Sequence, residues 1–536
     1  MAKDLFSFSM PSPSCLAESD IQYILNYIDG EEAVAESGIP DVHSKNMKKE
    51  QRTDSAVCDW SQHSVSPLLI QEEMSVFKQI EPQPVAMTSL GLLGHYWDVQ
   101  QRHKQQKQPR KIEEEMPVNR QRLSTVEIIR VAGERFIQLQ EQKDDDSNVV
   151  THPYGLSFSG LSKEDTKDME LTLILLSAAE KVGERQFDCA SRFLSHCKML
   201  SSKQGSPLQR IILCFAEVLS EWVHNATGKY EPKGLKEPKC LATSPGWFPC
   251  HNQLPQIQIA QFTSIQAMVD CTSTARRIHV IDLALRTGVH MIVLMQALSE
   301  RKTKAVELLK VTAVATVEKE KVEESGRRLA SVAKTMGLNF SFEVIFLDSI
   351  GDADDALFQI EDGEAVVIYA SMALRTMLSQ QTGLEKLMNI LRNLHPSVMV
   401  VIEIEGNHNS SSFFSCFIET LFFYGASFDC LETCMADDAE NMRFTEQYLC
   451  LELKNILSAE GNERTVRDVK IAVWRAFFKR YRMVEIGFSK SSLYQARLVA
   501  QQFPCSSFCT IEQNRKCLIL GWRGTPLLSL SAWKFR

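Results

Sequence analysis

Between residues 255 and 404 the chain alternates short apolar runs with helix-length segments, and this rhythm limits its possible folds more than any other feature. Five runs rich in Val, Ile, Leu and Phe have the length of strands, at 278–283, 309–314, 340–346, 365–369 and 398–404. Helical periodicity fills the segments between them, at 264–270, 290–300, 322–336 and 383–394. This alternation predicts βαβ units, and therefore an α/β fold whose mostly parallel sheet carries helices on both faces.

A leucine-rich block of predicted helices precedes the sheet. Residues 123–140 have helical periodicity, and residues 168–223 favour two or three further helices with an apolar face. Such a face packs either inside its own domain or against a second chain, and the pattern leaves both alternatives open. The side chains that would form a contact with a second chain are Leu171, Leu175, Phe193, Phe215 and Leu219.

Residues 1–118 differ from the rest because they are rich in Ser, Gln, Pro, Glu and Lys and show little periodicity. We expect a largely disordered tail, since this composition buries too little apolar surface to offset the cost of ordering. Two short apolar segments, 21–28 and 90–97, are candidates for folding on a partner. Five basic residues within 102–111 are typical either of a nuclear-import signal or of a solvated run of charge.

The formal net charge of −8 and the pI of about 5.9 argue against a protein that coats nucleic acid by bulk charge. A local basic patch is still compatible with these values. A helix predicted near 468–481 would interleave basic and aromatic side chains and contact phosphates or an acidic partner, or simply form a solvated face. The candidate residues of this segment are Arg464, Arg467, Lys470, Arg475, Lys479 and Arg482.

The 15 cysteines are scattered along the chain. Two pairs have a spacing of four, Cys430 with Cys434 and Cys505 with Cys509, but no matching histidine pair accompanies them. Structural zinc sites need paired ligands at tight spacing, so we expect reduced thiols and no metal. Neither a signal-peptide pattern nor an uncharged apolar run of about 18 residues is present, which predicts an intracellular protein without a membrane span.

The first predicted strand ends in an acidic residue and a turn, where α/β folds bind ligands. Asp282, Gly288 and His290 are the candidate cofactor-binding residues, and S-adenosylmethionine is the cofactor that such a position would take. The turn holds a single glycine, whereas phosphate-cradling loops need several. The alternative is structural, with Asp282 as a helix cap or acceptor and His290 as a buried side chain.

A second polar cluster follows the strand at 398–404 and contains Glu403, Glu405 and His408. Two carboxylates at i and i+2 of a strand lie on the same side, so acid–base chemistry is conceivable. The other interpretation is a strand end, a turn and helix capping through Asn407 and Asn409, followed by a helix at 413–424. No G-x-S-x-G, H-E-x-x-H or P-loop motif occurs in the chain, so we predict no catalytic residues.

From about residue 120 onward, six motifs in the same order resemble those of the plant GRAS family. Residues Ile278, His279, Val280, Ile281 and Asp282 resemble the VHIID signature, and Ser531, Ala532 and Trp533 match the terminal SAW motif. The other matches are 324–329 with 336–340 in the second leucine-rich region, 401–409 at a strand end, 417–421 with 424–432 in the PFYRE region, and 452–461 with 464–467. The chain departs from the family at 288–291, at Cys416 and at 264–267, and it lacks the Asp-Glu-Leu-Leu-Ala run of the DELLA branch.

The resemblance implies a methyltransferase-like, Rossmann-type sheet with an all-helical cap, which would span residues 119–536 behind the tail. The regions it implies are 166–230 for the first leucine-rich region, 249–314 for VHIID, 323–355 for the second leucine-rich region, 365–459 for PFYRE and 462–536 for SAW. It further implies a non-enzymatic nuclear regulator of transcription that needs no cofactor. Its partners would be other GRAS proteins, in homo- or heterodimers, and DNA-bound transcription factors. The alternatives are a transcription factor that binds DNA directly and a methyltransferase that uses S-adenosylmethionine.

Overall fold

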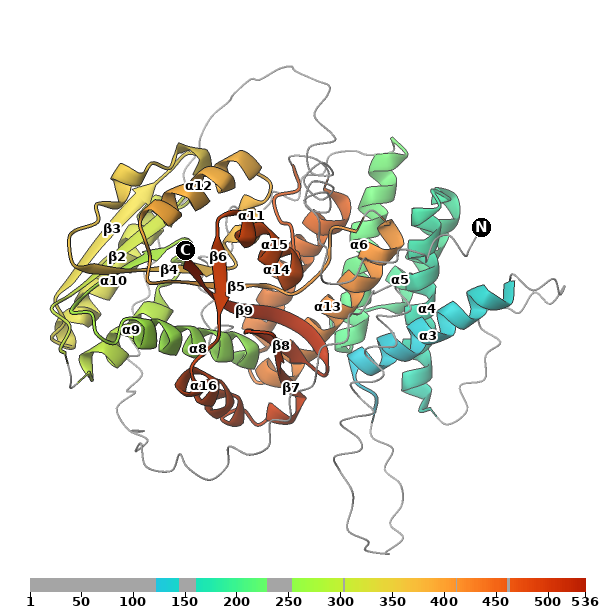
Figure 1. The fold of residues 1–536 in the computed structure, drawn as a ribbon. Helices are drawn as coiled ribbons and strands as arrows, with labels where there is room; N and C mark the ends of the chain where they lie inside the picture. The colour runs from blue at the N-terminus through green and yellow to red at the C-terminus, as the bar shows by residue number, and fades with distance from the viewer. Residues whose placement is uncertain (1–121, 144–160, 229–252, 302–303, 411, 460–462) are drawn as a thin grey trace, which may run out of the picture.

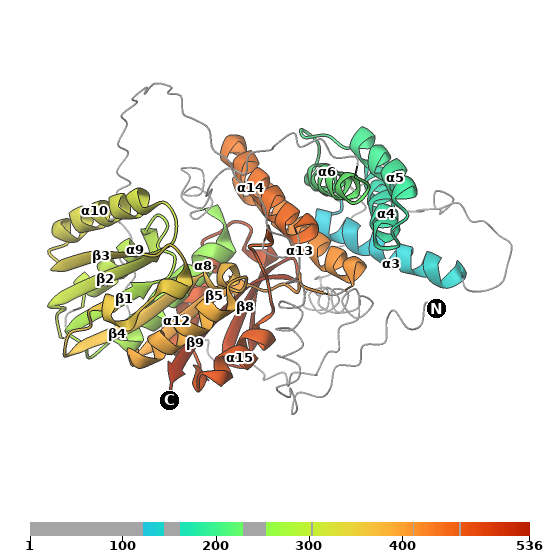
Figure 2. The same ribbon diagram turned by 90° about the horizontal axis from the view of Figure 1, so that it is seen from above.

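The computed structural model describes residues 122–143, 161–228, 253–301, 304–410, 412–459 and 463–536, without the side chains of 137–143. The predicted tail, its two apolar segments and the basic run at 102–111 lie outside these residues. Within the described residues the chain builds a twisted sheet flanked by helices and, beside it, a group of helices (Figures 1 and 2).

The sheet confirms all five predicted strands and adds four more near the carboxyl terminus. Its strands are β1 Arg277–Asp282, β2 Leu308–Ala315, β3 Phe340–Phe346, β4 Glu364–Ser371, β5 Val398–Ile404, β6 Met483–Ile486, β7 Cys509–Asn514, β8 Cys517–Trp522 and β9 Thr525–Phe535. Their order is β3-β2-β1-β4-β5-β9-β8-β7, with β6 paired to β9. Strands β1 to β5 run parallel, while β9 is antiparallel to β5 and leads into an antiparallel extension.

Two apolar cores lie on the two faces of the sheet, because successive side chains of a strand point to opposite faces. On β5, Val398, Val400 and Ile402 belong to one core, and Met399 and Val401 belong to the other. The first core is covered by α8 Pro255–Cys271, α9 Val289–Ser299, α10 Lys319–Thr335 and α16 Lys490–Gln501. The second is covered by α11 Leu374–Met377, α12 Gln381–Asn393 and α15 Ile471–Arg480, with the short turns η4 Ile350–Asp352 and η5 Asp355–Phe358. This two-sided covering is the predicted α/β architecture.

The helical cap lies beside the sheet and contains the predicted leucine-rich block. It consists of α3 Thr125–Lys143, α4 Lys163–Gly183, α5 Phe187–Leu200 and α6 Pro207–Ala226, which pack on α13 Phe413–Met435 and α14 Ala439–Ser458 (Figure 2). Serine side chains define two of these helices at their N-termini, with Ser162 accepting from the Asp165 amide and Ser206 from the Gln209 amide. This capping satisfies amides that have no partner inside the helix.

Helix α13 is long and apolar enough to cross a membrane by length and composition alone. No such segment was expected, because the chain contains no uncharged apolar run of about 18 residues. In the fold, 78% of the most apolar window of α13 is buried, and the helix packs on α3, α6 and α14. Its apolar composition is therefore accounted for by its central position between the cap and the sheet.

The carboxyl-terminal third departs most from the sequence-based expectation. The helix predicted near 468–481 begins only at Ile471, so residues 464–470 are not helical. The helix predicted at 413–424 continues to Met435, and the long helix α14 was not predicted at all. The terminal motif lies in β9, where Ser531 pairs with Val401 in the middle of the sheet.

Candidate functional site

The carboxyl end of β1 brings together two of the three candidate cofactor-binding residues. The Nε2 atom of His290 lies 2.6 Å from Asp282 Oδ2, and the imidazole stacks on the ring of Tyr369 with centroids 4.7 Å apart. The other carboxylate oxygen of Asp282 accepts a hydrogen bond from the Ala284 amide at 2.9 Å. Both oxygens of the fully buried Asp282 are therefore already bonded to the protein itself.

The turn after β1 leaves a cofactor little room. Leu285 is buried in the core, and Gly288 adopts a φ of +72°, which a side chain would strain. A Cβ on Gly288 would lie 3.1 Å from the side chain of Leu329. The glycine thus serves a turn packed against α10 and does not open a cradle, so the residues at this position do not fit S-adenosylmethionine. The structural alternative for Asp282 and His290 agrees with this geometry.

The remaining signature residues have structural positions. His279 is buried, with Nδ1 3.0 Å from Glu364 and Nε2 2.7 Å from the Thr312 hydroxyl. Burial lowers the pKa of this histidine. In the terminal motif the Trp533 indole donates to the Ser531 hydroxyl at 2.9 Å and packs on Phe478. These motifs hold the sheet together.

A buried ion network lies at the carboxyl ends of β4 and β5, and its centre is Arg375, which was not among the predicted site residues. This guanidinium donates to Asp468 at 2.5 and 3.0 Å and to Glu452 at 2.7 Å. Arg375 holds the pKa of the buried Asp468 carboxyl at about 2, against the opposing effect of burial. The network ties α11 to α14 and to the segment before α15. The one sequence signal for this network is that Arg375 is a charged residue within the otherwise apolar run after β4.

The second polar cluster has a structural role in this geometry. Glu403 accepts from the Leu374 amide at 2.8 Å, Glu405 from the Ile471 amide at 2.9 Å, and His408 Nδ1 lies 2.8 Å from Asp468. Burial raises the pKa of Glu403 to about 8 and that of Glu405 to about 7. The two carboxylates contact separate helices and do not face a shared space.

The predicted helix capping by asparagine is wrong in detail. Ser412 caps α13 by accepting from the Ser415 amide, whereas Asn409 donates to the Asp468 carbonyl at 2.6 Å. Asn407 is exposed. The bend from β5 into α13 is therefore held by the segment before α15, which the sequence places some 60 residues away.

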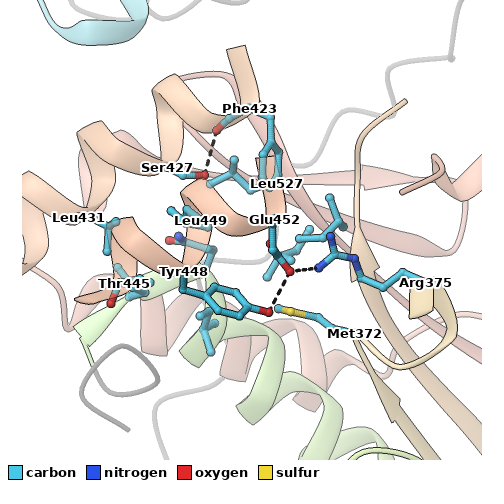
Figure 3. Close-up of a pocket in the computed structure, with 15 residues that line it drawn as sticks. Met372, Arg375, Phe423, Ser427, Leu431, Thr445, Tyr448, Leu449, Glu452 and Leu527 are labelled. Carbon is cyan, nitrogen blue, oxygen red and sulfur yellow. Dashed lines mark hydrogen bonds and ion pairs between the residues drawn. The ribbon is translucent and has the colours of Figure 1, made fainter. Parts of the chain in front are cut away.

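A pocket of about 80 Å³ adjoins the ion network (Figure 3). Its polar end holds Arg375, Glu452 and Tyr448, whose hydroxyl donates to Glu452 at 2.9 Å. The other walls are largely apolar and come from the ends of β4 and β5, the start of α8, α13, α14 and the start of β9, including Leu254, Ile257, Met372, Ile404, Phe423, Leu431, Leu449, Leu527 and Leu528. Its polar groups bond to one another across the seam between sheet and helices, so the pocket brings no reacting pair together.

The six basic candidates do not form one surface. Lys470 pairs with Glu419 at 2.9 Å, and Arg475 forms two 3.0 Å bonds with Glu485. Arg464 donates to the His408 carbonyl, and Arg467 is buried. Among the six, only Lys479 and Arg482 are exposed. The prediction of a basic helix face is wrong, because 464–470 are not helical and folding commits most of these charges to internal partners.

The predicted dimerisation residues lie mainly in the core of the cap. Leu171, Leu175, Phe215 and Leu219 are buried, and Phe193 is partly buried against the same core. These five side chains pack the cap internally, so an accessible surface for a second chain has to be sought elsewhere on it. Exposed apolar side chains stand at the end of α5, where Met199 is 73% and Leu200 52% accessible.

Among the described residues, no group of three or more His, Cys, Asp or Glu side chains is arranged to hold a metal ion. The expectation of reduced thiols is wrong for one pair, because Cys214 on α6 and Cys450 on α14 form a disulfide. The two cysteine pairs with a spacing of four, Cys430 with Cys434 and Cys505 with Cys509, are distant in sequence but adjacent in the fold, between α13 and the segment that leads into β7.

The comparisons with known proteins agree with this architecture. The model of the GRAS domain family matches residues 171–534. The chain belongs to the GRAS family. Its fold is similar to that in the crystal structure of SCL7 from Oryza sativa, with a TM-score of 0.60 and 21% identity, covering 68% of this chain and 99% of that one.

The curated relatives of this GRAS chain include DELLA proteins. It is 26% identical to DELLA protein GAI1 of Vitis vinifera over 376 residues, covering 69% of this chain and 63% of that protein. It is 27% identical to DELLA protein RGL1 of Arabidopsis thaliana over 375 residues, covering 69% and 71%. The chain thus spans less than two thirds of the length of the first relative. GRAS proteins are plant regulators of transcription, and placement outside the DELLA branch stays a prediction from the missing motif.

Proposed function

We propose that this chain is a non-enzymatic nuclear regulator of plant transcription that acts through protein contacts, as a homo- or heterodimer with GRAS proteins and with DNA-bound transcription factors. Membership of the GRAS family supports the regulatory role. The proposal that the chain is not an enzyme rests on Asp282, whose carboxylate oxygens are bonded to His290 and to the Ala284 amide at the position where a methyltransferase would bind its cofactor.

The cap supports dimerisation through its outer face. The apolar face of the cap helices is buried in the chain's own core. A contact with a second chain therefore has to use side chains that remain exposed after folding. Met199 and Leu200 are adjacent, large and apolar, and they end a helix whose other exposed residues are mostly polar. Burying such side chains against a second cap would remove apolar area from water, which is the main driving force of association.

The experiment compares two charge insertions with respect to self-association and reporter output. Met199→Asp with Leu200→Asp places charges on the proposed surface. The matched control is Tyr494→Asp on α16, an exposed side chain of 48% accessibility on another element. Analytical ultracentrifugation measures dimerisation, and a promoter-reporter assay in plant nuclei measures transcription.

We expect the cap variant to dissociate and to lose most reporter output while its melting temperature stays unchanged, and the Tyr494 control to behave like the parent chain. A cap variant that dimerises normally contradicts the assigned surface. A chain without any effect on reporters, whether dimeric or not, contradicts the regulatory function itself.

A further inference from the structure

Four cysteine thiols lie in a row between α13 and the segment that leads into β7, in the order Cys430, Cys434, Cys505 and Cys509. The sulfur of Cys434 lies 3.9 Å from that of Cys430 and 3.4 Å from that of Cys505, and Cys509 continues the series with its sulfur 3.8 Å from the Cys505 carbonyl. Two C-x₃-C pairs that are 71 residues apart in sequence are thereby neighbours. Only the Cys434–Cys505 contact joins the two separate elements.

Contacts other than the thiols hold these elements in place. Asp429, next to Cys430, accepts hydrogen bonds at 2.7 Å from both the Trp522 indole and the Arg523 guanidinium. Arg523 in turn lies 3.7 Å above the ring of Phe508, the neighbour of Cys509. The sulfur atoms of Cys434 and Cys505 are therefore held close before any bond joins them.

We propose that Cys434 and Cys505 form an oxidative cross-linking site that takes a low-molecular-weight disulfide of the glutathione class as its oxidant. The Cys434 thiolate attacks one sulfur of the oxidised glutathione and expels one glutathione thiolate. Cys505 then attacks the mixed disulfide at Cys434, and the second glutathione thiolate leaves. The two cysteines lose two electrons and two protons in total, and the two glutathiones gain them.

Exposure and acidity set the rate of this reaction. Cys434 and Cys509 are half-buried, whereas Cys430 and Cys505 are buried, so an oxidant reaches Cys434 and Cys509 first. The hydrogen bond with Cys430 and burial raise the pKa of Cys434, and burial raises the pKa of Cys505 and Cys509 to about 12. Since only the thiolate attacks, cross-linking is slow at neutral pH and accelerates about tenfold per pH unit below that pKa.

The cross-link would fasten the outer strand of the sheet to the central helix. Strand β7 pairs only with β8 among the described residues, and Cys505 lies just before it. A covalent bond to α13 restrains local opening of this edge, a region whose amide protons otherwise exchange through such openings. A disulfide between Cys430 and Cys434 would join two residues of the same helix, α13, and could not have this effect.

The test uses the full chain, reduced and desalted, then incubated with oxidised glutathione at pH 7 and pH 8. We expect non-reducing peptide mapping to join the peptides of Cys434 and Cys505, about tenfold faster at the higher pH. Amide exchange over residues 502–514 should slow by about tenfold in the cross-linked chain. Cys434→Ser and Cys505→Ser each abolish the cross-link, while Cys271→Ser, a half-buried cysteine on α8, serves as the matched control and preserves it.

Cys430→Ser keeps the reactive pair and should still cross-link. This variant shows that a serine in the cluster does not by itself unfold the site, so the loss of the cross-link in Cys434→Ser and Cys505→Ser can be attributed to the missing thiol. Three results overturn the proposal: stable glutathione adducts on Cys434 or Cys509 without a cross-link, a bond confined to Cys430 and Cys434, or a metal ion that copurifies with the chain and protects the thiols until a chelator removes it.

Discussion

The substitution Arg375→Met tests whether the buried ion network stabilises the seam between the sheet and α14. Arg375 is 4% accessible and makes three bonds to two carboxylates. Methionine keeps much of the volume but leaves Asp468 buried with His408 as its remaining side-chain partner. Removing one partner of a buried ion pair costs about 3–5 kcal/mol, because the other charge stays desolvated.

Urea denaturation at pH 7, followed by circular dichroism, measures the change in the free energy of unfolding. The deficit should shrink as the pH falls from 7 towards 4. Without the guanidinium, burial raises the pKa of Asp468, and protonation then removes the stranded charge. The parent chain behaves in the opposite sense, because its lowered pKa contributes stability above about pH 4 that is lost as the pH falls towards 2.

The double variant Arg375→Met with Asp468→Asn is the internal control. If the stranded charge is the cause, neutralising it should restore a large part of the loss, and the two substitutions should be strongly non-additive. A loss below about 1 kcal/mol in the single variant, or a double variant as unstable as the sum of both, would refute the reasoning.

Three further substitutions test other parts of the structure. Glu403→Gln should remove part of the pH dependence of stability: because burial raises the pKa of Glu403 to about 8, its contribution to folding is present at low pH and is lost as the pH rises from about 4.5 towards 8, and an unchanged slope in the variant contradicts this assignment. Leu175→Asp should unfold the cap at a cost of about 4 kcal/mol or more, seen in thermal melts, and a stable monomer would mean that this residue faces a partner. Gly326→Ala should cost about 1–3 kcal/mol in the same melts, since its Cβ would lie 2.1 Å from the Phe342 ring, and an unchanged melting temperature would show that the ring moves freely.

Sequence patterns predicted the parallel sheet well because its strands are buried on both faces and appear as continuous apolar runs. The strand at 398–404 agrees with β5 residue for residue. The same logic failed for α14, whose polar and apolar residues mix around the helix, since it packs on the cap with one side and on the pocket with another. Periodicity detects a face, but it does not say what covers that face, which is why the pattern could not decide whether Leu175 packs in its own core or against a second chain.

The site was harder to predict than the fold because its partners are distant in sequence. Arg375 and Asp468 are 93 residues apart, and neither belongs to a spaced motif. The cysteine spacing was visible, yet the approach of Cys434 to Cys505 depends on how α13 packs against the sheet edge. In the basic segment, counting charges overestimated the surface, because Arg475 bonds to Glu485 and not to an external phosphate.

The chain builds a Rossmann-type sheet, and its own side chains fill the position at the end of β1 where such a sheet would bind a cofactor. Isothermal titration calorimetry with S-adenosylmethionine tests this claim most directly, with an active methyltransferase titrated under the same conditions as a positive control. The bonds that commit both oxygens of Asp282 predict no heat of binding at any protein concentration that the calorimeter accepts. Saturable binding in the micromolar range, lost in Asp282→Asn, would contradict the claim and return the chain to the class of cofactor-dependent enzymes.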